Sequence, residues 1–142
     1  MSAFRGPLVV VRIAVGLLLA VHGWTRTLSG GVPGFGDYLA AEGFPAGHAL
    51  AWAISLFEIF GSFCLVIGRL VRFVAPVHIV ILASGIAMVH AREGWFVVGG
   101  GRNGVEYSVL LIACLAALAW DAWRAAPPAT LDRSLPEEKR ET

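Results

Sequence analysis

Charged residues are scarce in this chain of 142 residues: 15% are Asp, Glu, Lys or Arg, and the formal net charge is +1. Such a small balance argues against a nucleic-acid partner and against a polybasic patch for anionic lipids. Cysteine is rarer still, and its two copies, Cys64 and Cys114, lie in apolar stretches without CxxC spacing. Thiol–disulfide chemistry is therefore not expected, and both thiols are interpreted as small apolar residues of the interior.

The sequence also lacks the motifs of a catalytic centre. It shows no pairing of a nucleophile with a base, no nucleotide-binding loop and no cofactor fingerprint. These absences argue against an enzyme that acts alone. His22, His90 and Glu106 are candidate metal ligands, but no two of them have the i, i+3 or i+4 spacing that makes a metal motif specific. No metal is therefore predicted.

Long apolar stretches fill most of the chain, which is 57% hydrophobic with a mean hydropathy of +0.73. Four of them approach the ~20 residues that a helix needs to cross a hydrocarbon core of ~30 Å. They cover residues 7–24, 48–68, 71–90 and 105–123. We therefore predict an all-α polytopic membrane protein, an antiparallel four-helix transmembrane bundle, as one domain over residues 1–124. The first stretch is interpreted as a retained span, because Ala20-Val21-His22 is a poor cleavage site.

The connections between the spans have distinct lengths. Residues 25–47 form the longest, and a short helical turn over residues 35–41 is expected there against the membrane surface. The turn at residues 68–71 is so short that spans two and three must form an antiparallel hairpin. The charged, non-periodic residues 125–142 are expected to be a mobile cytoplasmic tail.

Basic residues predict the orientation. An even number of spans places both termini on one side, which also carries Arg5, Arg69, Arg72 and Arg124 close to the membrane. The connections on the other side carry Arg26, Arg92 and Arg102, offset by Asp37, Glu42 and Glu93. Cytoplasmic loops hold the excess of Lys and Arg, so both termini are predicted to be cytoplasmic.

Six titratable residues interrupt the spans or lie at their rims: Arg12, His22, Glu58, His78, His90 and Glu106. Such residues usually face a bundle interior and find partners, because a charge in the hydrocarbon core costs several kcal/mol. With a rise of about 1.5 Å per residue, Arg12 lies roughly 7 Å and Glu58 roughly 15 Å from the cytoplasmic edge. We predict that they form a buried polar pair, whose role is either to fix helix register or to build a site.

A second polar layer is expected near the opposite edge. His22, Arg26, His90 and Glu106 reach similar depths there and are predicted to converge as an outer polar pocket. The pocket is either a proton-linked or quinone-contacting site or a hydrogen-bonded rim that seals the bundle. His78, by contrast, is expected to hydrogen-bond a backbone carbonyl or a serine of a neighbouring span.

Several segments resemble the DoxX family, in order and at family-like spacing. They are Arg12–Gly16 with His22-Gly23-Trp24 and Arg26, Gly43-Phe44-Pro45, Leu56–Gly61 with Gly68, His90 to Gly94-Trp95-Phe96, and Gly104–Tyr107. The resemblance implies a four-helix integral protein of the bacterial cytoplasmic (inner) membrane, and it places the family's polar motif residues at Arg12, Glu58 and Glu106. It also implies an association with redox or thiol-stress systems, since relatives include the small membrane subunit of thiosulfate:quinone oxidoreductases. Two departures are Arg26, where lysine is frequent, and Ala129–Asp132, which only faintly echoes the usual ending.

Together these observations favour an integral membrane subunit of a redox-linked complex, quinone- or thiol/sulfur-associated, without a catalytic centre of its own. Its expected partners are the lipid bilayer, a membrane or soluble redox protein, and quinone. The alternative is a small transporter or permeation protein that uses Glu58 and the outer histidines. A purely structural role is a third class.

Overall fold

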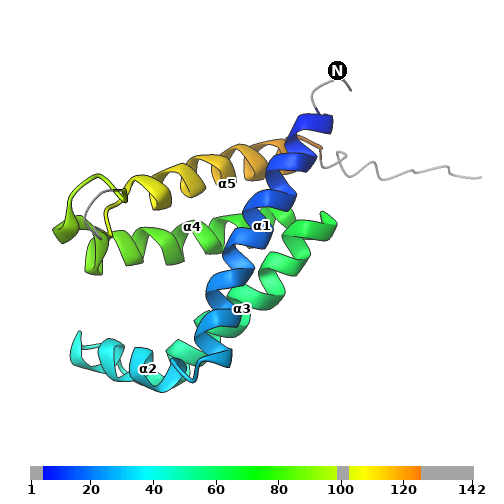
Figure 1. The fold of residues 1–142 in the computed structure, drawn as a ribbon. Helices are drawn as coiled ribbons and strands as arrows, with labels where there is room; N and C mark the ends of the chain where they lie inside the picture. The colour runs from blue at the N-terminus through cyan, green and yellow to red at the C-terminus, as the bar shows by residue number, and fades with distance from the viewer. Residues whose placement is uncertain (1–4, 99–102, 126–142) are drawn as a thin grey trace, which may run out of the picture.

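A computed structural model describes residues 5–98 and 103–125 of the chain, and the secondary structure of these residues is entirely helical. The elements in chain order (Figure 1) are α1 (Arg5–Leu28), α2 (Val32–Ala41), α3 (Gly47–Ile67), α4 (Val71–Met88), the 3-10 helix η1 (His90–Glu93) and α5 (Glu106–Ala125). α1, α3, α4 and α5 are each long and apolar enough to cross a membrane. The prediction of an all-α, multi-pass membrane protein is confirmed. Of the tail predicted over residues 125–142, Ala125 is the last residue of α5, and the remaining residues lie outside the described ranges.

The four long helices form two pairs, α1 with α3 and α4 with α5. Figure 1 shows that the pairs converge at the end that holds the α3–α4 turn and diverge at the other end. The N-terminal end of α1 and the C-terminal end of α5 both lie at the convergent end. A buried cluster that includes Val15, Leu65, Val74 and Leu115 fills the space where the two pairs meet.

Glycines allow α1 to approach α3 closely. A Cβ atom at Gly23 would lie 2.8 Å from the Ser55 carbonyl oxygen, and one at Gly16 would lie 2.8 Å from the Val66 side chain. Small residues at a helix interface permit this contact in membranes, where packing rather than the hydrophobic effect holds helices together.

The turn from α3 to α4 depends on Gly68. This residue has φ +76° and ends α3, with its N–H bonded to the Leu65 carbonyl and the Arg69 N–H bonded to the Cys64 carbonyl. The pattern is a Schellman motif, which needs a left-handed residue that only glycine supplies without strain. The predicted hairpin of spans two and three is present.

The first connection differs from its prediction. Its helix begins at Val32, three residues earlier than expected, because Pro33 fits the first turn of a helix. Val32 and Leu39 are buried against Ala51 of α3. α2 therefore packs on α3 at the divergent end (Figure 1), and its place against the membrane surface stays a prediction.

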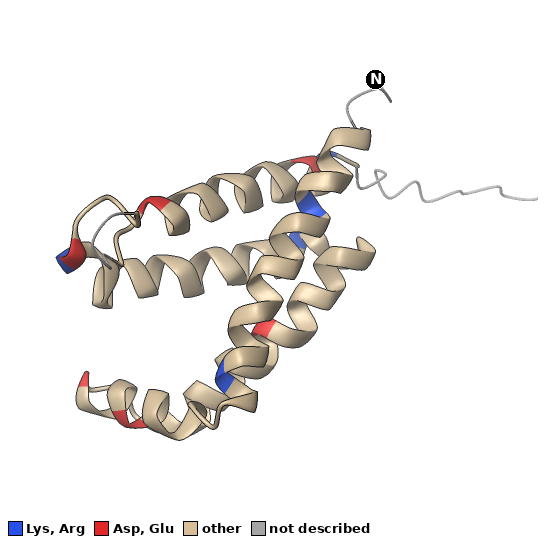
Figure 2. Ribbon diagram, viewed as in Figure 1, with Lys and Arg blue, Asp and Glu red and all other residues tan. Residues whose placement is uncertain are grey.

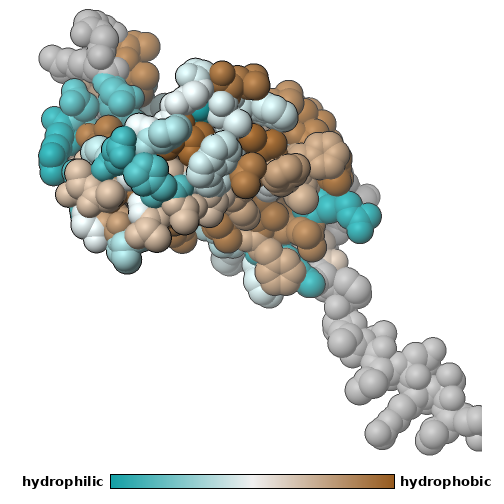
Figure 3. All heavy atoms as spheres, turned by 90° about the horizontal axis from the view of Figure 1, so that it is seen from below, coloured by the Kyte–Doolittle hydropathy of each residue, from teal (hydrophilic) through white to brown (hydrophobic). Residues whose placement is uncertain are grey.

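The outer surface suits a lipid environment. Phe60, Phe63 and Leu110 are each more than 60% exposed. A continuous apolar surface of this kind is lipid-facing in a membrane protein. Figure 2 shows that charged residues are few along the helices, and Figure 3 shows hydrophilic residues mainly near the ends of one face. The helices therefore contact the lipid bilayer along most of their length.

Candidate functional site

A cavity of about 550 Å³ lies at the divergent end, between the two helix pairs. Its walls are mainly apolar and come from all the helices and from the connections between them; they include Leu19, Phe35, Phe44, Leu50, Ile54, Leu82, Met88 and Val97. Polar side chains line it as well: Arg26, Glu58, His22, Tyr107 and His90. An apolar cavity with a few convergent polar groups is the usual form of a small-molecule site.

Arg26 and Glu58 form an ion pair in this cavity. The Arg26 Nη1 atom lies 2.7 Å from Glu58 Oε2 and donates a second hydrogen bond of 3.2 Å to Ser55 Oγ. The side chain of Glu58 is only 8% exposed, and that of Arg26 is 23% exposed. The guanidinium also lies 4.5 Å from the centre of the Phe35 ring. The structure thus holds the two charges together, neutralising each other where the surroundings are apolar.

The partner of Glu58 is a correction to the sequence analysis, which paired it with Arg12. In a helix each Cα–Cβ bond tilts toward the N-terminus. On α1 this tilt turns Arg12 away from the membrane centre and Arg26 toward it, while on the antiparallel α3 it turns Glu58 toward Arg26. Gly23 packs directly on Glu58, so Arg26 is less than one turn from the carboxylate. An estimate of depth that only counts residues along each helix ignores the direction in which the side chains point.

Three of the four residues predicted for the outer polar pocket lie around this cavity. His22, Arg26 and His90 all line the cavity. The ring centre of His22 lies 6.3 Å from that of Tyr107, and His90 Nδ1 lies 2.8 Å from the Asn103 carbonyl oxygen.

Glu106 does not line the cavity. It is the first residue of α5, and its carboxylate accepts a hydrogen bond of 3.4 Å from the Val97 backbone N–H. The backbone N–H groups of Val105 and Glu106 bond to the carbonyls of Gly94 and Trp95. Glu106 therefore closes the loop before α5. Arg102, which the sequence places in a connection on this side of the membrane, lies outside the described residues.

Two tyrosines line the cavity that the sequence analysis did not select. Tyr107 follows Glu106, and the helical phase of α5 points it, not its neighbour, into the cavity. Tyr38 of α2 donates a hydrogen bond of 3.3 Å to the Met88 carbonyl at the end of α4, which joins the two sides of the cavity. The signal for Tyr38 in the sequence was weak, because the sequence of a connecting segment does not show where its side chains lie in the fold.

His78 lies apart from this cavity. It is 1% exposed, its Nε2 is 3.3 Å from Ser62 Oγ, and its Nδ1 is 3.1 Å from the Val74 carbonyl oxygen. The prediction was a carbonyl or a serine of a neighbouring span. The serine, Ser62, belongs to the neighbouring α3, whereas the Val74 carbonyl belongs to α4, the helix that holds His78. Among the described residues, no group of three or more His, Cys, Asp or Glu side chains is arranged to hold a metal ion.

Comparison with known protein families gives a match to this chain. The model of the DoxX family matches residues 7–91, which is more than half of the chain and includes α1 to α4. Neither the curated proteins nor the solved structures contain a match to this chain. The matched range includes Arg26 and Glu58 but ends before Glu106 and Tyr107.

Proposed function

This chain belongs to the DoxX family, and from that premise we propose that it is the membrane subunit of a redox-linked complex and binds quinone in the divergent-end cavity. The observation that carries the proposal is the position of three hydrogen-bond donors, Arg26, His22 and Tyr107, in an otherwise apolar cavity. The chain lies in the bacterial cytoplasmic (inner) membrane, and its partner is a membrane-bound or soluble redox protein. The subunit has no catalytic centre of its own.

A quinone head group fits the chemistry of this cavity. It is a flat apolar ring with two carbonyl acceptors, and a cavity of about 550 Å³ is within the range of small-molecule sites. Leu82 and Ile54 supply apolar walls, while the Tyr107 hydroxyl and a His22 N–H are donors for a carbonyl. When bound, quinone would supply electron acceptance. The chain's own contribution is to hold and orient the ring and to keep its polar edge away from lipid.

Solute permeation is the less favoured alternative. On α1, α3 and α5, the lining residues furthest from the divergent end are Leu19, Glu58 and Ser108. Beyond these residues the space between the helix pairs is filled by a buried apolar cluster that includes Leu65 and Leu115, both 0% exposed. A continuous polar path to the convergent end would need this cluster to separate, so ligand binding requires less rearrangement than transport does.

Filling the cavity tests the proposal. A Cβ at Gly85 would meet nothing nearer than the His90 ring at 3.9 Å, so Gly85→Leu adds bulk to the cavity without a backbone clash. We expect the variant, purified in mild detergent, to carry about one tenth as much quinone as the native protein, or less. A tenfold loss corresponds to about 1.4 kcal/mol of binding free energy. Gly34→Leu is the matched control, because an exposed Gly34 has no atom within 4 Å of its Cβ position.

Equal quinone in the two glycine variants and the native protein would refute binding in this cavity. The same preparations report on the partner: an oxidoreductase of quinones or sulfur compounds should co-purify with the native protein.

The orientation is also testable. We propose cytoplasmic termini, which places the α3–α4 turn in the cytoplasm and the α1–α2 connection outside. Single cysteines at the exposed positions Ser29 and Arg69, in a Cys64→Ala/Cys114→Ala background, are treated with a membrane-impermeant thiol reagent in intact cells. Ser29→Cys should be labelled at once and Arg69→Cys only after permeabilisation. The reverse pattern would place the termini outside.

A further inference from the structure

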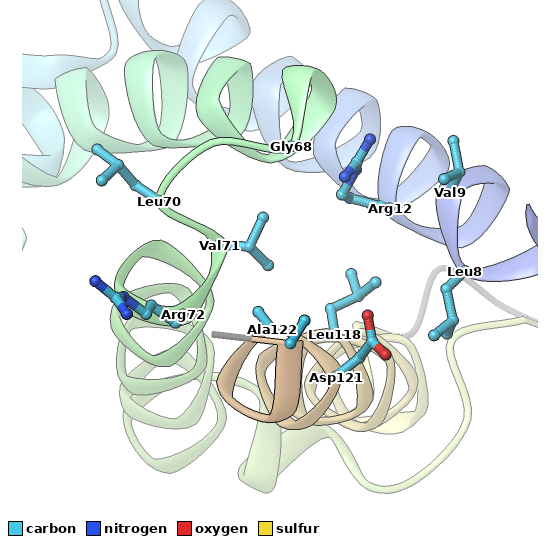
Figure 4. Close-up of a pocket in the computed structure, with 11 residues that line it drawn as sticks. Leu8, Val9, Arg12, Gly68, Leu70, Val71, Arg72, Leu118, Asp121 and Ala122 are labelled. Atoms are coloured by element: carbon cyan, nitrogen blue, oxygen red, sulfur yellow. The ribbon is translucent and has the colours of Figure 1, made fainter. Parts of the chain in front are cut away.

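A second cavity, of about 520 Å³, lies at the convergent end between α1, α4 and α5 (Figure 4). Its apolar walls include Leu8, Val71 and Leu118. Two oppositely charged residues, Arg12 of α1 and Asp121 of α5, also line it. The buried cluster described above separates it from the divergent-end cavity, and the proposed quinone site makes no use of it.

Arg12 is held in place but has no charged partner in the part of the chain that the structure describes. Its guanidinium occupies the space that a side chain at Gly68 would fill, so Gly68 is needed for room as well as for its positive φ. Its Nε atom is buried without a hydrogen-bond partner. Among the described residues no carboxylate lies within 4.0 Å of it. A desolvated donor of this kind is costly unless something accepts its hydrogen bonds.

Asp121 faces the same space from the opposite wall. It is partly buried, and Figure 4 shows its carboxylate pointing from α5 into the space between α5 and α1. Within the described residues it too forms no ion pair. Arg72, at the rim, is engaged elsewhere, since its guanidinium lies 4.7 Å from the Phe73 ring centre and 6.0 Å from that of Trp123. A positive and a negative group thus border one cavity without bridging it.

Both residues lie within two helical turns of the end of a span, so their side chains can reach lipid head groups. Arg12 is six residues inside the span that begins at Gly6, about 9 Å by helical rise. Its side chain leans back toward the N-terminus and the interface. Asp121 is four residues from the end of the span at Ala125, about 6 Å by the same rise. A phospholipid carries its phosphate and its head-group charge at this boundary.

We propose that the convergent-end cavity binds the head group of an ethanolamine-type phospholipid, with the phosphate on Arg12 and the ammonium on Asp121. Guanidinium to phosphate and ammonium to carboxylate are both charge-assisted hydrogen bonds. An anionic glycerol head group would leave Asp121 without a cation. A choline head group has no N–H to donate to the carboxylate. The pair of opposite charges therefore selects a zwitterion that bears a primary ammonium.

Lipid titration with detection by native mass spectrometry tests this proposal. Delipidated full-length protein is titrated with phosphatidylethanolamine, phosphatidylglycerol, phosphatidylcholine or inorganic phosphate. The native protein should bind the ethanolamine lipid at least about tenfold more tightly than the other two lipids, the difference expected for one charge-assisted contact. Asp121→Asn should lose this preference while still binding phospholipid, and Arg12→Met should lose affinity for all three. Arg69→Gln, an exposed arginine at the same end, is the control and should bind as the native protein does.

Three results would overturn the proposal: equal affinity of the native protein for all three lipids, an unchanged preference in Asp121→Asn, or competition by inorganic phosphate at the lipid's own concentration. The last result would indicate a site for a free anion. If Arg12→Met does not fold, Arg12→Lys replaces it and should keep the affinity for the ethanolamine lipid to within about tenfold, because the charge remains while the paired donors are lost.

Discussion

Replacing Arg26 by methionine should lower the free energy of unfolding by about 3–5 kcal/mol, by analogy with buried ion pairs in soluble proteins. The substitution leaves the Glu58 carboxylate, on a side chain that is 8% exposed, without its cation in apolar surroundings. Glu58→Gln should be less damaging, because an amide can still accept the hydrogen bond from Arg26. Reversible unfolding in mixed micelles measures both single variants and the double variant. The double variant should lose less than the sum of the singles.

Arg12 provides a matched control for this cycle. The combination of Arg12→Met with Glu58→Gln should be additive within about 0.5 kcal/mol, since the two residues are not partners in the structure. Additive losses in the Arg26 cycle would show that Arg26 and Glu58 are not coupled. Coupling in the Arg12 cycle would show that Glu58 pairs with Arg12 instead, as the estimate of depth from the sequence predicted.

The second large effect is expected at Gly23. A Cβ there would lie 2.8 Å from the Ser55 carbonyl oxygen, 2.9 Å from the Ile59 side chain and 3.0 Å from the Glu58 Cβ. Gly23→Val must therefore push α1 away from α3, at a cost of about 1–3 kcal/mol or more, and stretch the Arg26–Glu58 contact. Gly6→Val in the same helix is the control, because a Cβ at Gly6 has no neighbour within 4 Å.

Thermal unfolding in detergent compares the two glycine variants with the native protein. A large drop in the midpoint for Gly23→Val with little change for Gly6→Val is the expected result. Similar midpoints for both would mean that α1 and α3 do not approach closely at Gly23.

The sequence predicted the spans well because their signal is local. Each needs only enough apolar residues in a row, and the observed helices α3 and α4 begin and end within two residues of the predicted bounds. α1 continues to Leu28, four residues past the predicted end, because the first strong helix breaker is Gly30-Gly31. His78 was also predictable, since a buried imidazole in an apolar span has few partners other than a carbonyl or a hydroxyl.

The polar contacts were harder to predict because they depend on side-chain direction and on the packing of distant segments. Arg26 was placed at the rim by residue count, yet its long side chain reaches back to Glu58. Glu106 looked like a pocket residue, but the fold of the loop before α5 gives its carboxylate a backbone N–H instead. α2 is mainly apolar, but nothing in its local pattern indicated that it would cover one side of a cavity.

Photolabelling with a quinone that carries a light-activated azide would test most directly whether the divergent-end cavity is a quinone site. If the cavity binds quinone, labelled peptides should come from its walls, at α4 near Leu82 and Met88 and at α5 near Tyr107, and unlabelled quinone should compete with the label. Gly85→Leu should lose this labelling and Gly34→Leu should keep it. Labelling that no competitor reduces, spread equally over the lipid-facing residues Phe60 and Phe63 of α3, would show that the cavity is not a quinone site.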